Sequence, residues 1–207
     1  PEVITRTYSV TDDCLNTINV TQTITVGDNI LPTASNIAPV SVQCLSDLPV
    51  ANIADVTDEA DNCTALPIVT FIGDIDNGGT CPKIFTRTYN VADDCGNSIQ
   101  VSHIIIVDDD TPPTASDPVS IEIYNTANIP NPDVNVVIDE ADNCVIPTVT
   151  FINEVSNNDT CQLIITRTYS VTDDCGNSIN VSNDIIVYDT VAPTATEKFT
   201  SMPPVQK

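Results

Sequence analysis

The chain of 207 residues has no tryptophan, one histidine and six lysine and arginine residues, against 29 aspartate and glutamate residues. The formal charge of −23 argues against nucleic acid or an anionic membrane as the partner, because both require a basic face. No apolar run approaches the length of about 18 residues that predicts a membrane-spanning helix. The remaining partner classes are cations, sugars and proteins.

Residues typical of catalytic sites are also scarce. We find no glycine-rich phosphate loop and no serine nucleophile motif. Two carboxylates can hydrolyse a glycoside only across a sugar-binding cleft, and aromatic side chains, which usually line such clefts, make up 4% of this chain. The single histidine, His103, aligns with Gln22 and Asn183 in the internal repeats described below, so we interpret it as a polar interruption in a strand. The sequence therefore predicts a protein that is not an enzyme.

The dominant feature that is present is an internal repeat. The motif Thr-Arg-Thr-Tyr occurs at 5–8, 86–89 and 166–169, with starts 81 (86−5) and 80 (166−86) residues apart. Between these copies, the motif Asp-Glu-Ala-Asp-Asn-Cys occurs at 58–63 and again at 139–144. Self-similarity at a fixed period predicts a string of similar modules, each with its own core.

The period divides the chain into four parts. Pro1 occupies the repeat position of Pro82, so the N-terminal part is expected to hold the last two strands of an incomplete repeat. An alternative is that a neighbouring chain completes these strands, as in donor-strand filaments. The four parts are 1–31 (incomplete repeat), 32–112 and 113–193 (complete repeats), and 194–207 (the start of a further repeat or a tail).

The complete repeats are expected to be all-β. Valine, isoleucine and threonine are abundant, and alternation places Phe85, Arg87, Tyr89 and Val91 on one face of a strand. The turn residues 76–79, Asp-Asn-Gly-Gly, predict a hairpin because Asn and Gly tolerate positive φ. The predicted fold is a tandem array of immunoglobulin-like β-sandwich repeats of about 80 residues. In the first complete repeat we expect strands near 39–44, 50–56, 67–75, 83–93 and 98–107.

The recurring arginines Arg6, Arg87 and Arg167 supply half of the positive charge. Alternation directs each of them toward tyrosine and valine side chains. We therefore expect the aliphatic stem to pack at the edge of the core and the guanidinium to bind a carboxylate or a carbonyl.

The motif order V-x-C, D-E-A-D-N-C, T-C, T-R-T-Y-x-V-x-D-x-C-G-N and T-P-P-T resembles the hyalin-type (HYR-like) immunoglobulin-fold repeats of giant Bacteroidota cell-surface proteins. Those proteins include gliding-motility adhesins exported by the type 9 secretion system. The resemblance covers nearly the whole chain and implies a secreted, surface-attached protein. Leu15 departs from the pattern, since Gly96 and Gly176 occupy the equivalent positions. The second complete repeat has no counterpart of Cys44, and residues 197–207 leave the pattern.

Eight cysteines without a Cys-x-x-Cys motif predict disulfides and an oxidising, extracellular location. Cys81 and Cys95 flank one extended strand and would lie roughly 45 Å apart, far beyond bridging distance. An alternative scheme, Cys63–Cys81 with Cys44–Cys95, requires residues 64–80 to close on themselves. From the sandwich topology we predict Cys63–Cys95, Cys144–Cys175 and Cys44–Cys81, with Cys14 and Cys161 unpaired.

Carboxylates cluster at the expected junctions between repeats, where Ca²⁺ would neutralise them because it accepts six to eight hard oxygen ligands. The alternative is that they are solvated turn residues capping their own backbone. The predicted calcium site one comprises Asp28, Asp58, Glu59, Asp61, Asp93 and Asp94. The predicted site two comprises Asp109, Asp110, Asp139, Glu140, Asp142, Asp173 and Asp174.

These observations predict a non-enzymatic extracellular stalk segment of a large repetitive adhesin or filament at the cell surface. Its expected partners are further repeats of the same protein, neighbouring copies of itself, and a surface glycan or protein at a distal tip. One alternative is a self-polymerising fibre or sheath subunit joined by strand complementation. Another is a set of ligand-binding accessory modules of a secreted enzyme.

Overall fold

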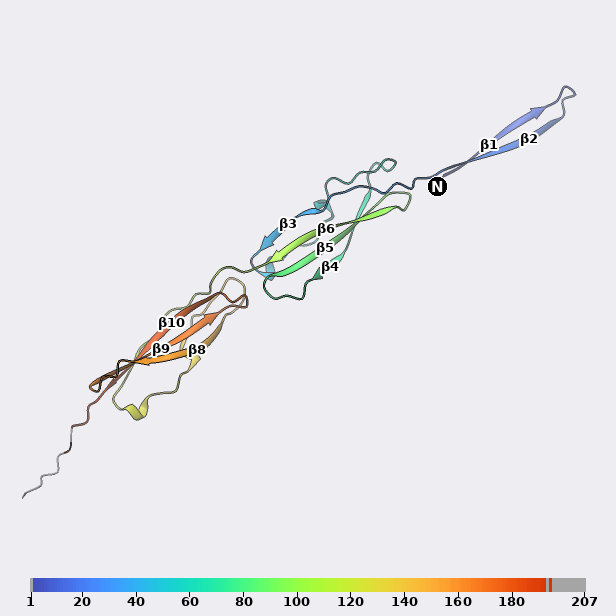
Figure 1. Ribbon diagram of the computed structural model, residues 1–207. Helices are drawn as coiled ribbons and strands as arrows, with labels where there is room; N and C mark the ends of the chain where they lie inside the picture. The colour runs from blue at the N-terminus through green and yellow to red at the C-terminus, as the bar shows by residue number, and fades with distance from the viewer. Residues whose placement is uncertain (1, 193, 195–207) are drawn as a thin grey trace, which may run out of the picture. The chain divides into compact units, whose positions relative to one another are not determined.

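The computed structural model describes residues 2–192 and 194, and the chain forms two compact units, Pro1–Thr111 and Pro112–Lys207 (Figure 1). Apart from Thr194, the segment 194–207 that was predicted to begin a further repeat lies outside the described residues.

The first unit contains a separate hairpin followed by the first repeat. Strands β1 (Glu2–Thr11) and β2 (Thr17–Val26) pair only with each other within the described part of the chain. The first repeat consists of β3 (Ile37–Val42), η1 (Leu45–Asp47), η2 (Ile53–Asp55), β4 (Ile68–Asp76), β5 (Lys83–Ala92) and β6 (Ser98–Val107).

The second unit repeats this order. It consists of β7 (Ile121–Ile123), η3 (Thr126–Asn128), η4 (Val134–Val136), β8 (Thr148–Ser156), β9 (Gln162–Thr172) and β10 (Ser178–Tyr188). The η elements are 3₁₀ turns, and no helix among the described residues is long and apolar enough to cross a membrane.

Each repeat is built on one four-stranded sheet. The strand orders are β3-β6-β5-β4 and β7-β10-β9-β8, so equivalent strands occupy equivalent places. The first strand of each repeat pairs in parallel with the last strand of that repeat, β3 with β6 and β7 with β10. The other pairings are antiparallel. The prediction of an all-β fold in tandem repeats is confirmed.

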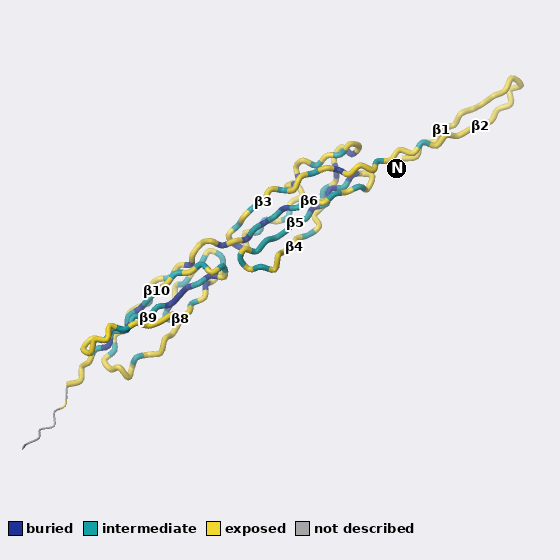
Figure 2. Tube along the Cα trace, in the orientation of Figure 1, coloured by how far each residue is buried: buried dark blue, intermediate teal, exposed yellow. Residues whose placement is uncertain are grey.

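The core of each repeat lies on one face of its sheet. In the first repeat Tyr89, Val91 and Val101 are buried, together with Val56 from outside the sheet. The strict alternation along β5 and β6 explains this, because successive side chains point to opposite faces, and Figure 2 shows buried positions along the central strands. The second core has the same composition at the same repeat positions: Val137, Tyr169, Val171 and Val181.

Opposite each sheet lies a covering layer with little strand structure, in the place where an immunoglobulin-like sandwich has its second sheet. In the first repeat its only β-pairing among described residues is the bridge between Thr33 and Ala60. The predicted strand at 50–56 is wrong, because residues 53–55 form the 3₁₀ turn η2. The Asn52 side chain accepts a hydrogen bond from the Ala54 N–H at 3.1 Å, which offers the backbone an alternative to a β-ladder.

The predicted hairpin turn between β4 and β5 is confirmed. Asn77 Oδ1 accepts hydrogen bonds from the N–H groups of Gly79 at 3.1 Å and Ile84 at 3.0 Å. Gly78 has φ +72°, a backbone conformation that costs glycine little.

The predicted environment of the repeated arginines is also confirmed in both repeats. Arg87 is 2% exposed, and its guanidinium donates two hydrogen bonds of 2.9 Å to Asp74. Arg167 donates to Glu154 at 3.1 Å and to the carbonyl of Pro130 at 2.6 Å. These ion pairs join the central strand to the edge strand within each sheet.

Candidate functional site

The segment that follows β2 brings a carboxylate to one end of the first repeat. Carboxylate oxygens of Asp28, Asp61 and Asp93 all lie within 4.8 Å of one another. The carbonyl of Asp28 accepts a hydrogen bond from the side-chain amide of Asn97 at 3.3 Å, which ties this segment to the β5–β6 turn. The structure therefore assembles three of the six residues predicted for calcium site one.

Three buried carboxylate oxygens in this region have no hydrogen-bond partner among the described residues. They are Asp28 Oδ2, Glu59 Oε2 and Asp61 Oδ1. A buried, unpaired carboxylate oxygen is costly unless a cation or a donor compensates it. Hard oxygen ligands of this kind are the donors that Ca²⁺ accepts, so the residues fit this ion.

Asp93 plays a structural part in the same cluster. Its side chain is buried and accepts hydrogen bonds from the N–H groups of Cys95 at 2.9 Å and Asn97 at 2.8 Å, and from the Asn97 amide at 2.6 Å. Burial opposes ionisation of Asp93, but these hydrogen bonds outweigh it, so its pKa lies below the usual value. Asp93 is thus kept charged while it caps its own turn. This is the role predicted for these acids by the alternative to a calcium site, in which they are turn residues that cap their own backbone.

Two other residues predicted to bind calcium, Asp58 and Asp94, are not among the three carboxylates that converge. Asp58 accepts hydrogen bonds from the Ser35 N–H at 3.0 and 3.2 Å, and the interaction with Ser35 lowers the pKa of Asp58. Asp94 is exposed. The bond to Ser35 makes Asp58 a structural cap at the start of the first repeat.

The second repeat reproduces several of these features. Asp139 accepts hydrogen bonds from the Ser116 N–H at 3.0 and 3.2 Å, and Asp173 caps its turn through Cys175 and Asn177. Buried oxygens of Glu140 and Asp142 have no hydrogen-bond partner among the described residues. The ligands predicted for site two come from both compact units, and that site stays a prediction.

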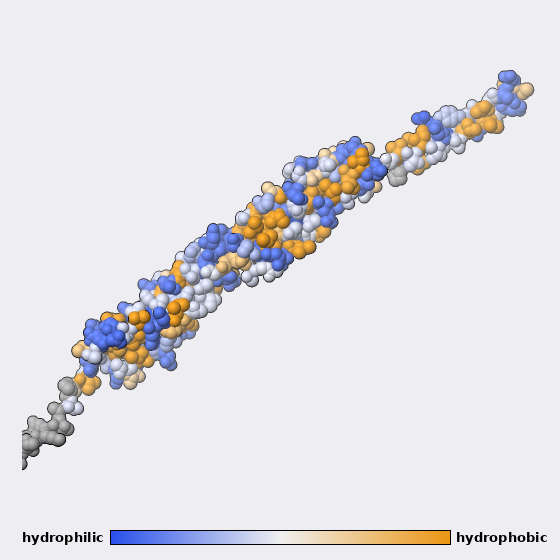
Figure 3. Space-filling model, in the orientation of Figure 1, coloured by the Kyte–Doolittle hydropathy of each residue, from blue (hydrophilic) through white to orange (hydrophobic). Residues whose placement is uncertain are grey.

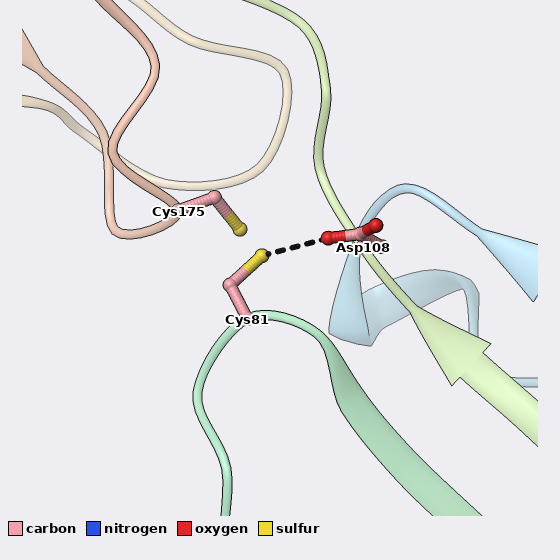
Figure 4. Close-up of side chains that lie close together, drawn as sticks. All are labelled: Cys81, Asp108 and Cys175. Atoms are coloured by element: carbon pink, nitrogen blue, oxygen red, sulfur yellow. Dashed lines mark hydrogen bonds between the residues drawn. The ribbon is translucent and has the colours of Figure 1, made fainter.

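The cysteines divide into two groups of four. Cys44, Cys81, Cys144 and Cys175 are disulfide-bonded, and two disulfides are typical of proteins from oxidising compartments. The Cys81 sulfur lies 3.3 Å from a carboxylate oxygen of Asp108 (Figure 4). The specific pairings Cys44–Cys81 and Cys144–Cys175 stay predictions. The free and exposed cysteines are Cys14, Cys63, Cys95 and Cys161.

The free state of Cys63 and Cys95 differs from the predicted bridge between them. A hydrogen bond with Asp28, loss of hydration and repulsion from Asp28 and Asp61 raise the pKa of the Cys63 thiol. A disulfide forms through the thiolate, so the acidic cluster disfavours the reactive form of Cys63. The sequence motifs place these acids and this thiol in adjacent loops, but the effect of the acids on the thiol depends on their distance in space.

A small pocket in the second repeat was not predicted from the sequence. It has a volume of about 230 Å³ and is lined by Tyr124, Asn125, Thr160, Tyr188 and Asp189, among others. The two tyrosine rings are stacked, with centroids 5.8 Å apart. The signal that could have found it is the replacement of Gln43 and Asp108 of the first repeat by tyrosines at the equivalent positions of the second.

No protein-family model and no curated protein matches this sequence. A solved structure entitled "PcdhgB3 EC1-4 in 50 mM HEPES" is similar with a TM-score of 0.31 and 14% sequence identity. The match covers 90% of this chain and 57% of that chain. A likeness this low carries no argument about what this chain does.

Proposed function

We propose that this chain is a stalk segment of a large, non-enzymatic extracellular adhesin or filament. The supporting observation is the residue-by-residue repetition of one sheet and one core in two separate units. A tandem array of self-sufficient modules supplies length and spacing, because each module contacts only its neighbours. The resemblance to HYR-like repeats supports a location at the cell surface and a part in attachment or gliding, with export by the type 9 system.

Calcium is the proposed ligand at the end of the first repeat. Asp28, Asp61 and Asp93 converge there, and Asp28, Glu59 and Asp61 each have a buried oxygen that a cation would satisfy. When bound, Ca²⁺ would supply positive charge and oxygen coordination. Asp28 follows β2 while Asp61 and Asp93 belong to the repeat, so the ion would fasten the segment entering the repeat to the repeat itself.

Thermal unfolding with chelator and with calcium tests this proposal. For a dissociation constant of about 10⁻⁴ M, as in extracellular modules, calcium at about 10 mM should stabilise the first repeat by about 2.7 kcal/mol. Asp61→Asn should abolish most of this increase, because it removes charge from a buried oxygen.

Asp47→Asn is the matched control, since Asp47 is an exposed aspartate on η1. It should leave the calcium effect unchanged. Equal melting temperatures in chelator and calcium would refute the ion site. The stalk itself is tested by small-angle scattering of the chain, where a compact globule would contradict it and an extended monomer would support it.

A second candidate function, ligand binding, is favoured by the pocket beside Tyr124 and Tyr188. Aromatic faces next to amide and carboxylate groups suit a sugar ring. A glycan array followed by calorimetry would detect saturable binding, which Tyr124→Ala should weaken at least about tenfold if the ring supplies 1.4 kcal/mol. No saturable binding to any glycan would remove this candidate and leave the stalk proposal intact.

A further inference from the structure

The hairpin formed by β1 and β2 is built like the central pair of strands in a complete repeat. Tyr8 lies opposite Val20 in the hairpin, as Tyr89 lies opposite Val101 between β5 and β6. Each residue of the hairpin therefore has a counterpart 81 positions later (89−8), in the same register and on the same face of the strand pair.

The two pairs differ in what covers them. Tyr8, Val10 and Val20 are 47%, 53% and 44% exposed, whereas their counterparts in β5 and β6 are 0%, 0% and 3% exposed. Figure 2 shows β1 and β2 as exposed along their length, and Figure 3 shows hydrophobic side chains on their surface. A two-stranded hairpin with an uncovered apolar face is marginally stable in water, so this face is a surface suited to a partner.

The first repeat shows what covers the equivalent pair of strands. Val56 packs into the core formed by Tyr89, and the Asn52 N–H donates a hydrogen bond to the Tyr89 hydroxyl at 3.2 Å. Strand β4 pairs with one edge of the β5–β6 pair and β3 with the other. All of these elements lie within residues 32–81. In the hairpin, the Tyr8 hydroxyl instead donates to the Gln22 side chain at 3.1 Å.

We propose that the hairpin is the acceptor for a segment that forms the front half of a repeat. That segment resembles residues 32–81, adds one antiparallel strand beside β1 and one parallel strand beside β2, and buries Tyr8, Val10 and Val20. A segment that is covalently joined to the hairpin has the smallest association cost, because β4 enters β5 through a short turn at 76–83 and closing an equivalent loop costs little entropy. This inference does not depend on the stalk or on calcium.

A chimera tests the proposal: the full chain with a second copy of residues 32–81 placed directly before Pro1. Amide hydrogen exchange in β1 and β2 should slow at least about 100-fold relative to the parent chain, because protection follows the free energy of opening. Sedimentation should show a monomer. Val56→Asp in the added copy should abolish the protection, whereas Val50→Asp, at a position where valine is 89% exposed in the first repeat, should preserve it.

Two results would overturn the proposal. Exchange in β1 and β2 that is as fast in the chimera as in the parent chain would show that the hairpin does not accept such a segment. A parent chain that already protects its hairpin by forming dimers, and loses both properties on Tyr8→Asp, would show that a second copy is the occupant.

Discussion

At the scale of single residues, the turn after the Asp-Asp-Cys motif requires a positive φ, which glycine supplies in two copies and leucine in the third. Gly96 and Gly176 have φ values of +94° and +91°, and the equivalent Leu15 has φ +71°. A side chain in this region costs roughly 1–2 kcal/mol. The sequence difference at Leu15 therefore marks a strained position, and not a change of turn.

We expect Gly96→Ala to destabilise the first repeat by about 1 kcal/mol, because alanine is disfavoured at positive φ. Gly73→Ala is the matched control: neither glycine has an atom within 4 Å of the added Cβ, but Gly73 does not have a positive φ. Urea unfolding should show a loss only for Gly96→Ala. An equal effect of both substitutions would contradict the strain argument.

The buried ion pair of Arg87 makes a second prediction at this scale. Hydrogen bonds with Asp74 raise the pKa of Arg87, which stays charged although it is buried. Asp74→Ala leaves that charge without its partner and should cost about 2 kcal/mol or more of unfolding free energy. Asp76→Ala removes the partner of the more exposed Lys83, 3.0 Å away, and should cost less than about 1 kcal/mol. Denaturant titrations that rank the two variants in the reverse order would disprove this.

At the scale of elements, the entry of each repeat depends on a carboxylate. Asp58 caps the Ser35 N–H, next to the bridge between Thr33 and Ala60, and Asp139 does the same for Ser116. These contacts attach the start of the repeat to the covering layer. Since both contacts use ionised oxygens, they are sensitive to acid.

The pKa values of Asp58 and Asp139 are lowered by their hydrogen bonds with Ser35 and Ser116. A carboxyl with a lowered folded-state pKa stabilises the protein fully above its unfolded pKa, near 3.8, and loses this contribution as pH falls through the folded value. Unfolding free energy should therefore decrease below about pH 4. The decrease should be smaller for Asp58→Asn in the first repeat, and identical pH profiles of the two proteins would count against this role.

Strands were the elements best predicted from sequence. The predicted strands at 67–75, 83–93 and 98–107 match β4, β5 and β6 within one residue at each end, because alternation and turn residues are local signals. The segment 50–56 looked equally apolar. Instead, Asn52 caps a 3₁₀ turn at residues 53–55, and the next residue, Val56, packs in the core. That outcome depends on a side-chain hydrogen bond and on packing against Tyr89, neither of which alternation encodes.

At the scale of the whole molecule, stability rests on two separate cores, and Cys44, Cys81, Cys144 and Cys175 are disulfide-bonded. A module of about 80 residues buries a modest fraction of its surface. Loss of the predicted Cys144–Cys175 link in Cys144→Ser should therefore destabilise the second repeat by about 2–5 kcal/mol, measured by urea unfolding. Cys161→Ser, at a free and exposed thiol, should have little effect. Peptide mapping without reduction should identify the predicted Cys44–Cys81 and Cys144–Cys175 links, and any other linkage would reject that scheme.

The sequence alone determined the all-β class, the period of the repeats and the face of each central strand that is buried, since these follow from local alternation and self-similarity. It also identified the acids that converge at the end of the first repeat. Only the tertiary structure decided which of them are already satisfied by the backbone, which cysteines stay free, and that Tyr8 is exposed where Tyr89 is buried. Those properties depend on what lies opposite each side chain in space, and identical motifs have different neighbours.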